Sequence, residues 1–421
     1  MSSPQKTPLP LLKRLGPGLI TGAADDDPSG IATYSQAGAQ YGFGLLWSVL
    51  LTTPLMAGIQ IVSARIGRVT GHGLAANIRD HYPAKLLYAI VALLLLANMF
   101  NIAADLSAMG TAMEISVGGP RQIWTMLFAG VSLGLQVFIP FPRYAPLLKW
   151  ATLSLFSYVA TVFVVHIPWE EAMRSALWPN FQWDAKYTST LVAVLGTTIS
   201  PYLFFWQASQ EVEEQRAAPG EMPLNEAPEQ ARDNFRRIKF DTWLGMIFSN
   251  LIALCIMLTA AATLNAHGVV TVESAAQAAQ ALRPLAGDFA FVLFTAGIVG
   301  TGMLAIPVLA GSAAYAVAES FRWPIGLGLP LLEARGFYTI LAIATLGGVG
   351  LGFTAIDPIK ALLWSAVANG VIAVPIMAVM MLLCTKPAVM GQFTARRRLR
   401  TLGWFSTAVM GAAVVAMFAT M

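Results

Sequence analysis

Three consecutive carboxylates lie in the middle of an apolar stretch near the start of the chain. Asp25, Asp26 and Asp27 interrupt the segment GLITGAADDDPSGIATYSQAG, and Pro28 and Gly30 follow them directly. Proline lacks an amide donor and glycine tolerates unusual dihedrals, so a helix should break here and free carbonyl oxygens. Carboxylate and carbonyl oxygens are ligands of hard divalent cations such as Mg²⁺, Ca²⁺ and Mn²⁺. The pattern predicts an oxygen-lined cation site with Asp27 and Gly30 in it.

A second interruption of similar form lies in the apolar segment LVAVLGTTISPYLFFWQAS. Thr197 and Ser200 precede Pro201 in mid-segment and would add hydroxyl oxygens to the site. The C-terminal ends of half-helices carry partial negative charge, which also favours a cation. Taken alone, Pro201 is equally compatible with an ordinary kink in a membrane helix. Its pairing with the acidic break favours a shared site, with Thr197 and Ser200 as further predicted metal ligands.

The elements around these breaks have the composition of a membrane protein. Hydrophobic residues make up 56% and charged residues 11% of the 421 residues, against roughly 45–50% and about 25% in soluble proteins. A spanning helix needs about 20 mainly apolar residues, and eleven stretches qualify. They cover residues 19–40, 43–64, 86–108, 123–139, 147–166, 191–209, 242–264, 289–310, 338–354, 362–384 and 402–420. The period-two alternation of a membrane β-barrel is absent, so the predicted fold class is an all-α integral membrane protein.

The spacing of the two breaks predicts an internal repeat. They lie five spans apart, which is the pattern of two inverted repeats with a site between two discontinuous helices. We expect repeats at about 19–166 and about 188–384, and an eleventh helix at about 402–420 outside them. No compositional break divides the chain, so residues 1–421 are expected to form a single transmembrane transporter domain. A carboxylate at the bilayer centre costs at least about 2.5–3.5 kcal/mol, so the acidic run must face a cavity rather than lipid.

The distribution of Lys and Arg predicts the orientation. With the N-terminus in the cytoplasm, only Arg121, Arg174, Lys186, Arg283 and Lys360 of the 26 basic residues fall on the outside. The positive-inside rule then places the protein in the cell membrane with its C-terminus outside. This bias also accounts for the net charge of +4 without a nucleic-acid partner. The basic cluster at 396–400 is interpreted as part of this signal, with contact to anionic lipid as the alternative.

Polar residues outside the breaks receive simpler interpretations. The longest polar insert, about residues 215–237, is predicted to be a solvated cytoplasmic loop. Asp241 and Asp288 lie at span ends, where solvent is near, and carry no predicted role. Asn98 and Asn101 are predicted to form hydrogen bonds between helices.

Two segments around the first break carry a family resemblance. They are GPGLITGAADDDPSGIATYSQAGAQYGFGLLW and IQIVSARIGRVTGHGLA, which resemble the first two helices of the Nramp family of divalent metal transporters. Similarity in helix count and order covers most of the chain, and motif similarity is confined mainly to spans one, two, three and six. The resemblance implies a LeuT-like fold and secondary transport of a divalent metal cation by alternating access.

The match at the first break is partial. The family motif is Asp-Pro-Gly-Asn; Asp27 and Pro28 keep it, whereas Ser29 and Gly30 stand in place of Gly and Asn. Loss of the Asn removes a side-chain ligand and enlarges the cavity. A roomy acidic site suits a partly hydrated Mg²⁺, because Mg²⁺ dehydrates reluctantly.

The match at the second break departs in the same direction. The family motif Met-Pro-His is replaced by Ser200, Pro201 and Tyr202. A Met thioether is a soft ligand that favours transition metals, whereas Ser200 offers a hard oxygen. The two departures together resemble the Nramp-related magnesium transporter branch, with Mn²⁺ as a second ion because it accepts oxygen ligands.

Proton coupling is not predicted. The family's sixth-helix histidines align with Tyr202 and Gln207, and Ala108 stands in place of the third-helix Glu that follows Asp105. No side chain that ordinarily titrates near neutral pH is therefore expected at the site. The alternative is a proton-coupled Mn²⁺ or Fe²⁺ transporter of the general Nramp type.

The remaining polar groups of these spans are assigned to the ion path. That set is Asp25, Asp26, Asp105, Tyr202, Gln207 and Asn369. Asp25 and Asp26 would line the cytoplasmic vestibule. For Asp105 a structural hydrogen bond to a neighbouring helix is an equal alternative, and for Asn369 the alternative is packing.

Other classes of function are disfavoured. The acidic run would repel the carboxylate of an amino acid, which argues against an amino-acid carrier of the same fold. An intramembrane aspartyl protease would pair Asp27 with Asp105, but the sequence has no Gly-x-Gly-Asp segment. An ion channel is not distinguished by sequence. We predict no enzyme activity and no cofactor besides the transported ion, and the expected partners are that ion and the lipid bilayer, without an obligate protein partner.

Overall fold

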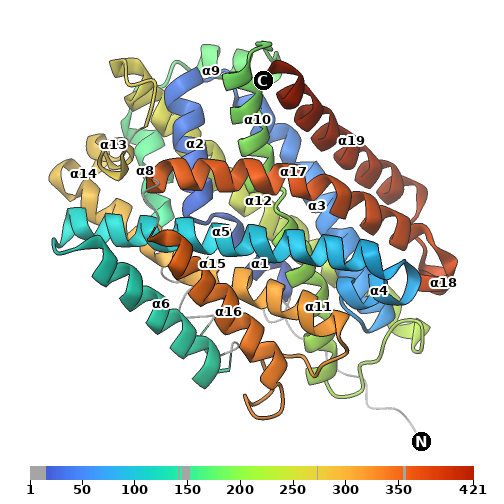
Figure 1. Cartoon of the computed structure of the whole chain (residues 1–421). Helices are drawn as coiled ribbons and strands as arrows, with labels where there is room; N and C mark the ends of the chain where they lie inside the picture. Colours follow the sequence, from blue (N-terminus) through green and yellow to red (C-terminus); the bar gives the residue numbers. More distant parts are fainter. Residues whose placement is uncertain (1–15, 141–142, 145–151, 273, 354–356) are drawn as a thin grey trace, which may run out of the picture.

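The two predicted breaks are present in the computed structural model, which describes residues 16–140, 143–144, 152–272, 274–353 and 357–421 (Figure 1). The first span consists of α1 (Pro17–Asp25) and α2 (Pro28–Tyr41). The sixth consists of α10 (Ala185–Thr198) and α11 (Pro201–Ala217). Each second half begins with proline, whose missing amide costs no hydrogen bond at the first helical position.

Long helices account for most of the predicted spans. They are α3 (Leu46–Thr70), α5 (Ala84–Ser116), α6 (Arg121–Phe138), α12 (Ala231–Thr263), α15 (Ala290–Ser320), α16 (Arg335–Gly352), α17 (Pro358–Thr385) and α19 (Arg397–Thr420). Within the described ranges, eight helical segments are long and apolar enough to cross a membrane, or nine if one bent pair is counted as a span. The prediction of an all-helical membrane protein is confirmed, and the count of eleven spans stays a prediction.

Short helices occupy the connections. They are α4 (Leu74–His81), η2 (Thr152–Leu155), α8 (Phe156–Val164), α9 (Trp169–Leu177), η3 (Pro228–Gln230), η4 (Asn265–His267), α13 (Ala275–Gln280), α14 (Arg283–Ala286), η5 (Gly287–Phe289), α18 (Pro387–Met390) and η6 (Gly391–Phe393). The chain bends by 118° between the segments 153–164 and 169–177, so α9 turns away from the predicted fifth span. The predicted loop at 215–237 is wrong at both ends, because α11 continues to Ala217 and α12 begins at Ala231.

Close helix packing holds the broken spans in place. A Cβ on Gly22 of α1 would lie 2.4 Å from the carbonyl oxygen of Gly245 in α12, so the two backbones are in contact. A Cβ on Gly196 of α10 would lie 2.4 Å from the amide nitrogen of Gly370 in α17. Small residues of this kind allow membrane helices to approach closely. The halves of each break are therefore fixed by continuous neighbouring helices.

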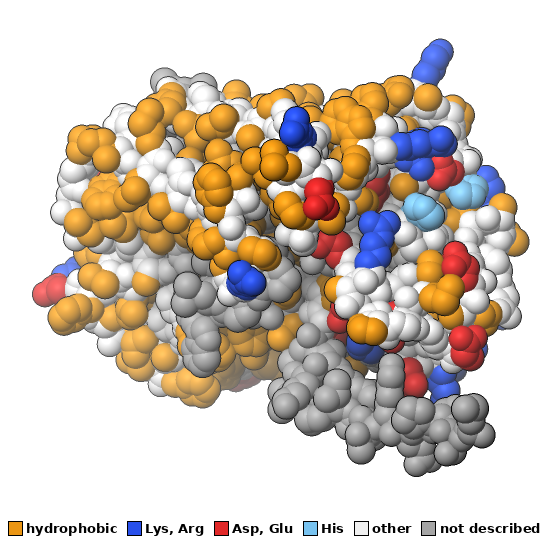
Figure 2. Space-filling model, turned by 90° about the horizontal axis from the view of Figure 1, so that it is seen from below, with side chains coloured by type: hydrophobic (Ala, Val, Ile, Leu, Met, Phe, Trp, Pro, Cys, Tyr) orange, Lys and Arg blue, Asp and Glu red, His pale blue; other side chains and the backbone are white. Residues whose placement is uncertain are grey.

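The surface separates apolar from charged regions. Seen from below, hydrophobic side chains cover one half of the molecule, and charged side chains gather on the side where α4 and α18 lie in Figure 1 (Figure 2). Large apolar side chains such as Phe138 and Phe163 are more than four-fifths exposed. Apolar surface of this extent is expected where helices face lipid.

Candidate metal-ion site

Asp27 occupies the gap between the two halves of the first span. It is the N-cap of α2, and its Oδ1 accepts a hydrogen bond from the Gly30 amide at 2.8 Å. Carboxylates are preferred at this position because they satisfy the free amides of a helix start. The second oxygen, Oδ2, accepts from the hydroxyl of Tyr202 at 3.2 Å. Asp27 is 2% exposed, so its charge is held away from bulk solvent.

Tyr202 links the two breaks. It lies in the first turn of α11, and its hydroxyl is 3.2 Å from both Asp27 Oδ2 and the carbonyl oxygen of Ala24. Ala24 belongs to the last turn of α1, whose carbonyls lack partners within the helix. The predicted meeting of the two discontinuous spans is confirmed by these contacts.

Oxygen atoms line the space beside Gly30 where a side chain would lie. A Cβ at this position would lie 3.4 Å from the carbonyl oxygen of Asp25 and 3.5 Å from Thr197 Oγ1. Asp27, Gly30 and Thr197 are therefore brought together as predicted, and the Asp25 carbonyl is an additional oxygen at the same place. The proline signal had indicated that carbonyls would be freed, but not which of them.

Ser200 is turned toward its own backbone. Its Oγ lies 2.9 Å from the carbonyl oxygens of both Gly196 and Thr197 at the end of α10. The hydroxyl hydrogen is thus used locally, and the hydroxyl lone pairs are left for another partner.

Asp25 and Asp26 meet a residue that the sequence had not indicated. Ser249 of α12 donates its hydroxyl to Asp25 Oδ2 at 2.6 Å and lies 3.2 Å from Asp26 Oδ1. Within the described structure, Asp25 Oδ1 and Asp26 Oδ2 have no hydrogen-bond partner. Both side chains are 1% exposed. The acidic run is therefore enclosed by protein rather than open to a wide vestibule.

Asp105 lies on α5 and faces the same region. It is fully buried, and neither of its carboxylate oxygens has a hydrogen-bond partner among the described residues. It lies close enough to Asp27 for the two carboxyl groups to repel each other when both are ionised. The alternative of a structural hydrogen bond to a neighbouring helix finds no support in these contacts.

The other two residues of the predicted path have protein partners. Asn369 of α17 and Asn101 of α5 exchange two amide hydrogen bonds, at 3.0 and 3.1 Å. Gln207 accepts a hydrogen bond of 2.5 Å from Thr21 of α1 through Oε1, whereas its Nε2 has no partner within the described chain. Asn101 thus joins helices as predicted, and Gln207 joins α11 to α1.

The site holds four buried carboxyl groups without a basic partner in the described ranges. Asp25, Asp26, Asp27 and Asp105 are all buried, and no salt bridge reaches any of them in the described ranges. Buried carboxylates without a counter-charge are costly, so a cation or protons must offset them. In the same ranges no three His, Cys, Asp or Glu side chains converge as a metal cluster.

Comparison with known proteins identifies the family. The model of the family "Natural resistance-associated macrophage protein-like", Nramp, matches residues 18–420. The chain belongs to the Nramp family. It is 26% identical over 346 residues to the "Divalent metal cation transporter MntH" of Yersinia pestis (strain Pestoides F), covering 79% of each chain. The protein of that name from Pectobacterium carotovorum is also 26% identical, over 79% of this chain and 78% of its own.

Solved structures agree on the fold of this Nramp-family chain. A manganese transporter from Eremococcus coleocola superposes with a TM-score of 0.73 at 16% identity, over 98% of this chain and 88% of that chain. Mhp1, a nucleobase-cation-symport transporter in a closed conformation, superposes with a TM-score of 0.56 at 13% identity, over 100% of this chain and 96% of its own. The expected LeuT-like fold is confirmed, and membership in a transporter family agrees with the prediction that the chain is not an enzyme.

One end of α1 is anchored by a residue to which the sequence had given no role. Asp241 of α12 accepts from the amides of Gly18 at 2.6 Å and Leu19 at 3.2 Å. The interpretation of Asp241 as a solvated span end is wrong, because its side chain is 1% exposed. No side chain within α1 caps this helix, so a carboxylate from another helix takes that place.

Further ion pairs surround the same end of α1. Arg237 of α12 pairs with Glu211 at 2.5 Å and Glu214 at 2.9 Å, both on α11. A Cβ on Gly16 would lie 2.4 Å from Arg237 Nη1 and 3.3 Å from Asp241 Oδ2, so the start of α1 rests on this cluster. We refer to Glu211, Glu214, Arg237 and Asp241 as the α1 latch, because together they tie α1 to α11 and α12.

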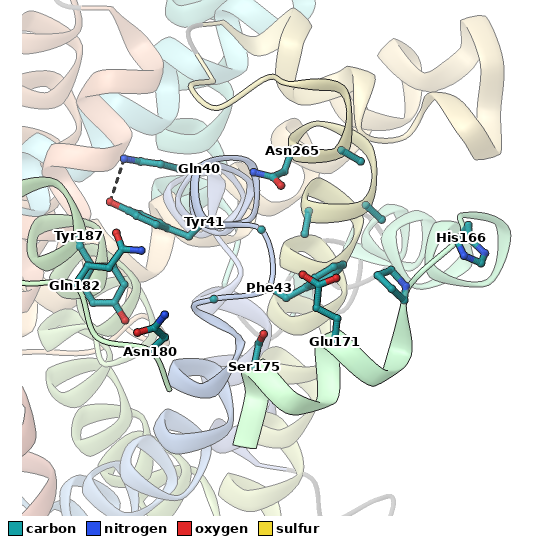
Figure 3. A pocket seen from close by; sticks show the side chains of 16 residues that line it. Gln40, Tyr41, Phe43, His166, Glu171, Ser175, Asn180, Gln182, Tyr187 and Asn265 are labelled. Carbon is teal, nitrogen blue, oxygen red and sulfur yellow. Dashed lines mark hydrogen bonds between the residues drawn. The ribbon is translucent and has the colours of Figure 1, made fainter. Parts of the chain in front are cut away.

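A separate cavity of about 660 Å³ lies at the other end of α2 (Figure 3). Gln40 and Tyr41 of α2, Glu171 and Ser175 of α9, and Asn265 line it together with other polar groups. None of the predicted metal ligands borders this cavity. The enclosed oxygen site at the breaks and this open cavity are therefore different features.

Proposed function

We propose that the chain carries Mg²⁺, with Mn²⁺ as a second ion, into the cytoplasm by alternating access and without moving protons. Family membership supports divalent metal cation transport as the general activity. The observation that carries the proposal is the chemistry around Asp27. The Tyr202 hydroxyl contacts Asp27, and the Asp25 carbonyl and the Thr197 hydroxyl lie beside Gly30 at the same break; all are hard oxygen groups.

The preference for Mg²⁺ rests on two positions. Gly30 leaves the space between Asp25 and Thr197 without a side chain, so a hydrated ion fits more readily than it would beside Asn. Ser200 presents oxygen where the family motif has the thioether of Met. Such a site has few fixed ligands and leaves water on the ion. It disfavours Fe²⁺ mainly because it lacks a soft donor, rather than because it keeps Fe²⁺ out of the cavity.

The closed α1 latch supports a mechanism of alternating access. The α1 latch closes the end of the first and sixth spans that the basic residues assign to the cytoplasm. Release of the ion on that side would require α1 to leave Asp241 while α12 stays in place. We propose that the repeats at about 19–166 and 188–384 move against each other in this step, with the eleventh helix outside them.

The proposal that no protons move rests on the groups at the site. Tyr202 and Gln207 occupy the positions of the family's sixth-helix histidines, and Ala108 replaces the third-helix Glu. A membrane potential supplies about 2.3 kcal/mol per charge per 100 mV, hence about 4.6 kcal/mol for a divalent ion. That driving force is enough for inward accumulation.

A second candidate is a proton-coupled Mn²⁺ or Fe²⁺ transporter of the general Nramp type. The observation in its favour is Asp105, whose two unpartnered oxygens lie buried near Asp27. A carboxylate in this position is suited to carry a proton. The names of the relatives, which refer to divalent metal cations and manganese, agree with this candidate as well.

Ion uptake by purified protein in liposomes separates the candidates. Uptake of Mg²⁺, Mn²⁺, Fe²⁺ and Ca²⁺ is followed in parallel with a pH-sensitive dye inside the vesicles. The first candidate predicts Mg²⁺ uptake without acidification, and the second predicts Mn²⁺ or Fe²⁺ uptake with it. Asp27→Asn is the inactive comparison, and Asp233→Asn on the exposed first turn of α12 is the matched control.

A further inference from the structure

Basic residues without counter-charges gather before the last helix. Arg396, Arg397, Arg398 and Arg400 lie at the start of α19, and no Asp or Glu follows Asp357 in the sequence. All four arginines are exposed, and none of them takes part in a salt bridge in the described structure. The positive charge at this end of the molecule is therefore left for an external anion.

A partly buried arginine on α3 belongs to the same group. The Arg65 guanidinium lies 3.9 Å from the centre of the Phe235 ring, and its Nη2 donates to the carbonyl oxygen of Phe393 at 3.1 Å. No carboxylate pairs with Arg65 in the described ranges, and Arg396 is close enough to Arg65 for their positive charges to repel each other. Neighbouring guanidinium groups without a carboxylate partner favour a bound anion.

The residues that follow the arginines on α19 indicate where the cluster lies relative to the membrane. Trp404 is 38% exposed and Phe405 is 52% exposed, one turn beyond Arg400 on α19. Tryptophan is enriched at the membrane interface, and the exposed Phe418 lies further along the same helix. The arginines therefore lie at the level of the lipid headgroups.

An apolar cluster separate from the main core adjoins the arginines. It consists of Ile61, Ala64 and Ile238 with Phe235, Trp243 and Leu399 packed against it. These residues come from α3, α12 and α19, and α3 packs against both of the other helices. Ile61, Ala64 and Ile238 are buried, whereas Phe235, Trp243 and Leu399 are partly exposed. A ligand held by the arginines would thus meet the apolar side chains of these last three residues, which an inorganic anion does not need and a lipid does.

We propose that Arg65, Arg396 and Arg400 bind the phosphodiester of an anionic phospholipid, whose acyl chains lie along α19. Guanidinium groups recognise phosphate oxygens through paired N–H donors, and clusters of basic residues beside a span attract anionic lipid. The inference does not depend on the transported ion, because none of these residues borders the site at the breaks.

Lipid titration of the full chain in detergent, followed by native mass spectrometry, tests this binding. The probes are dioleoylphosphatidylglycerol, dioleoylphosphatidylcholine and inorganic phosphate. The variant Arg396→Gln/Arg400→Gln is compared with Arg232→Gln/Arg335→Gln, which removes two other exposed arginines without salt bridges. We expect the cluster variant to bind phosphatidylglycerol about 30-fold more weakly, since each basic residue near anionic lipid contributes about fivefold.

The control variant is expected to bind phosphatidylglycerol as the parent does, and phosphatidylcholine should show no difference among the three proteins. If the control variant bound phosphatidylglycerol equally weakly, the loss of binding would be due to net charge alone, and the proposed site would be overturned. Unchanged binding in the cluster variant would overturn it as well. Saturation of the site by inorganic phosphate at the same concentration as lipid would contradict the lipid as ligand.

Discussion

Neutralising Asp241 should open the end of α1 that the latch holds. Its carboxylate accepts two amide hydrogen bonds, at 2.6 and 3.2 Å, from Gly18 and Leu19. Asp241→Asn keeps the shape, but it removes the charge that stabilises the helix start and turns one acceptor into a donor facing an amide. Hydrogen bonds to charged groups contribute about 1.5–3 kcal/mol, against about 1 kcal/mol for neutral ones. We therefore expect the closed state to lose about 2 kcal/mol, which corresponds to a roughly 30-fold larger open population.

Thiol labelling measures this opening. Thr21 of α1 is fully buried, so Thr21→Cys in a background of Cys255→Ser and Cys384→Ser should react slowly with a maleimide. Adding Asp241→Asn should raise the labelling rate about 30-fold, as the larger open population requires. Asp233→Asn, eight residues earlier on the same helix and exposed, is the control and should leave the rate unchanged. An unchanged rate in Asp241→Asn, or an equal increase in the control, would refute the latch.

Four further changes address the site and the helices beside it. Asp27→Asn should lower Mg²⁺ uptake about 100-fold or more while the protein remains folded, because breaking a buried ion pair costs about 3–5 kcal/mol; normal uptake at equal protein per liposome would contradict this. Gly30→Ala should leave the folding of the protein unchanged, since the added Cβ would meet oxygen atoms at ordinary contact distances of 3.4 and 3.5 Å. Gly30→Asn with Ser200→Met should shift binding from Mg²⁺ toward Mn²⁺ in calorimetry, and an unaltered ratio in a folded variant would argue against ligand softness. Asn101→Ala should lower stability by about 1–3 kcal/mol in thermal unfolding, because Asn369 is left without partners, with no change in ion preference.

The breaks could be predicted because their signals are local. Pro28 and Pro201 exclude a continuous helix by their own covalent structure, and α2 and α11 begin at these residues. Asp27 directly before a proline at the first helical position has the features of an N-cap, and it holds that role. Hydropathy over windows of about 20 residues was likewise sufficient for the long spans.

Features that depend on distant contacts could not be predicted in the same way. Asp241 and Gly18 are 223 positions apart, and Ser249 and Asp25 are 224 positions apart. In the sequence, Asp241 is indistinguishable from a solvated acid at a span end, because only the packing of α1 on α12 buries it. The short helices α4 and α9 escaped notice for a different reason, since they are too short for a spanning window and lie between spans.

Mg²⁺ uptake under an imposed membrane potential tests the central proposal most directly. Liposomes containing the protein, with a K⁺ gradient and valinomycin to set an inside-negative potential, are given external Mg²⁺ while internal Mg²⁺ and pH are recorded together. We predict that Mg²⁺ accumulates with the potential, that internal pH stays constant, and that Asp27→Asn abolishes the signal. Mg²⁺-dependent acidification above the leak of protein-free liposomes, or accumulation that persists in Asp27→Asn, would contradict the proposal.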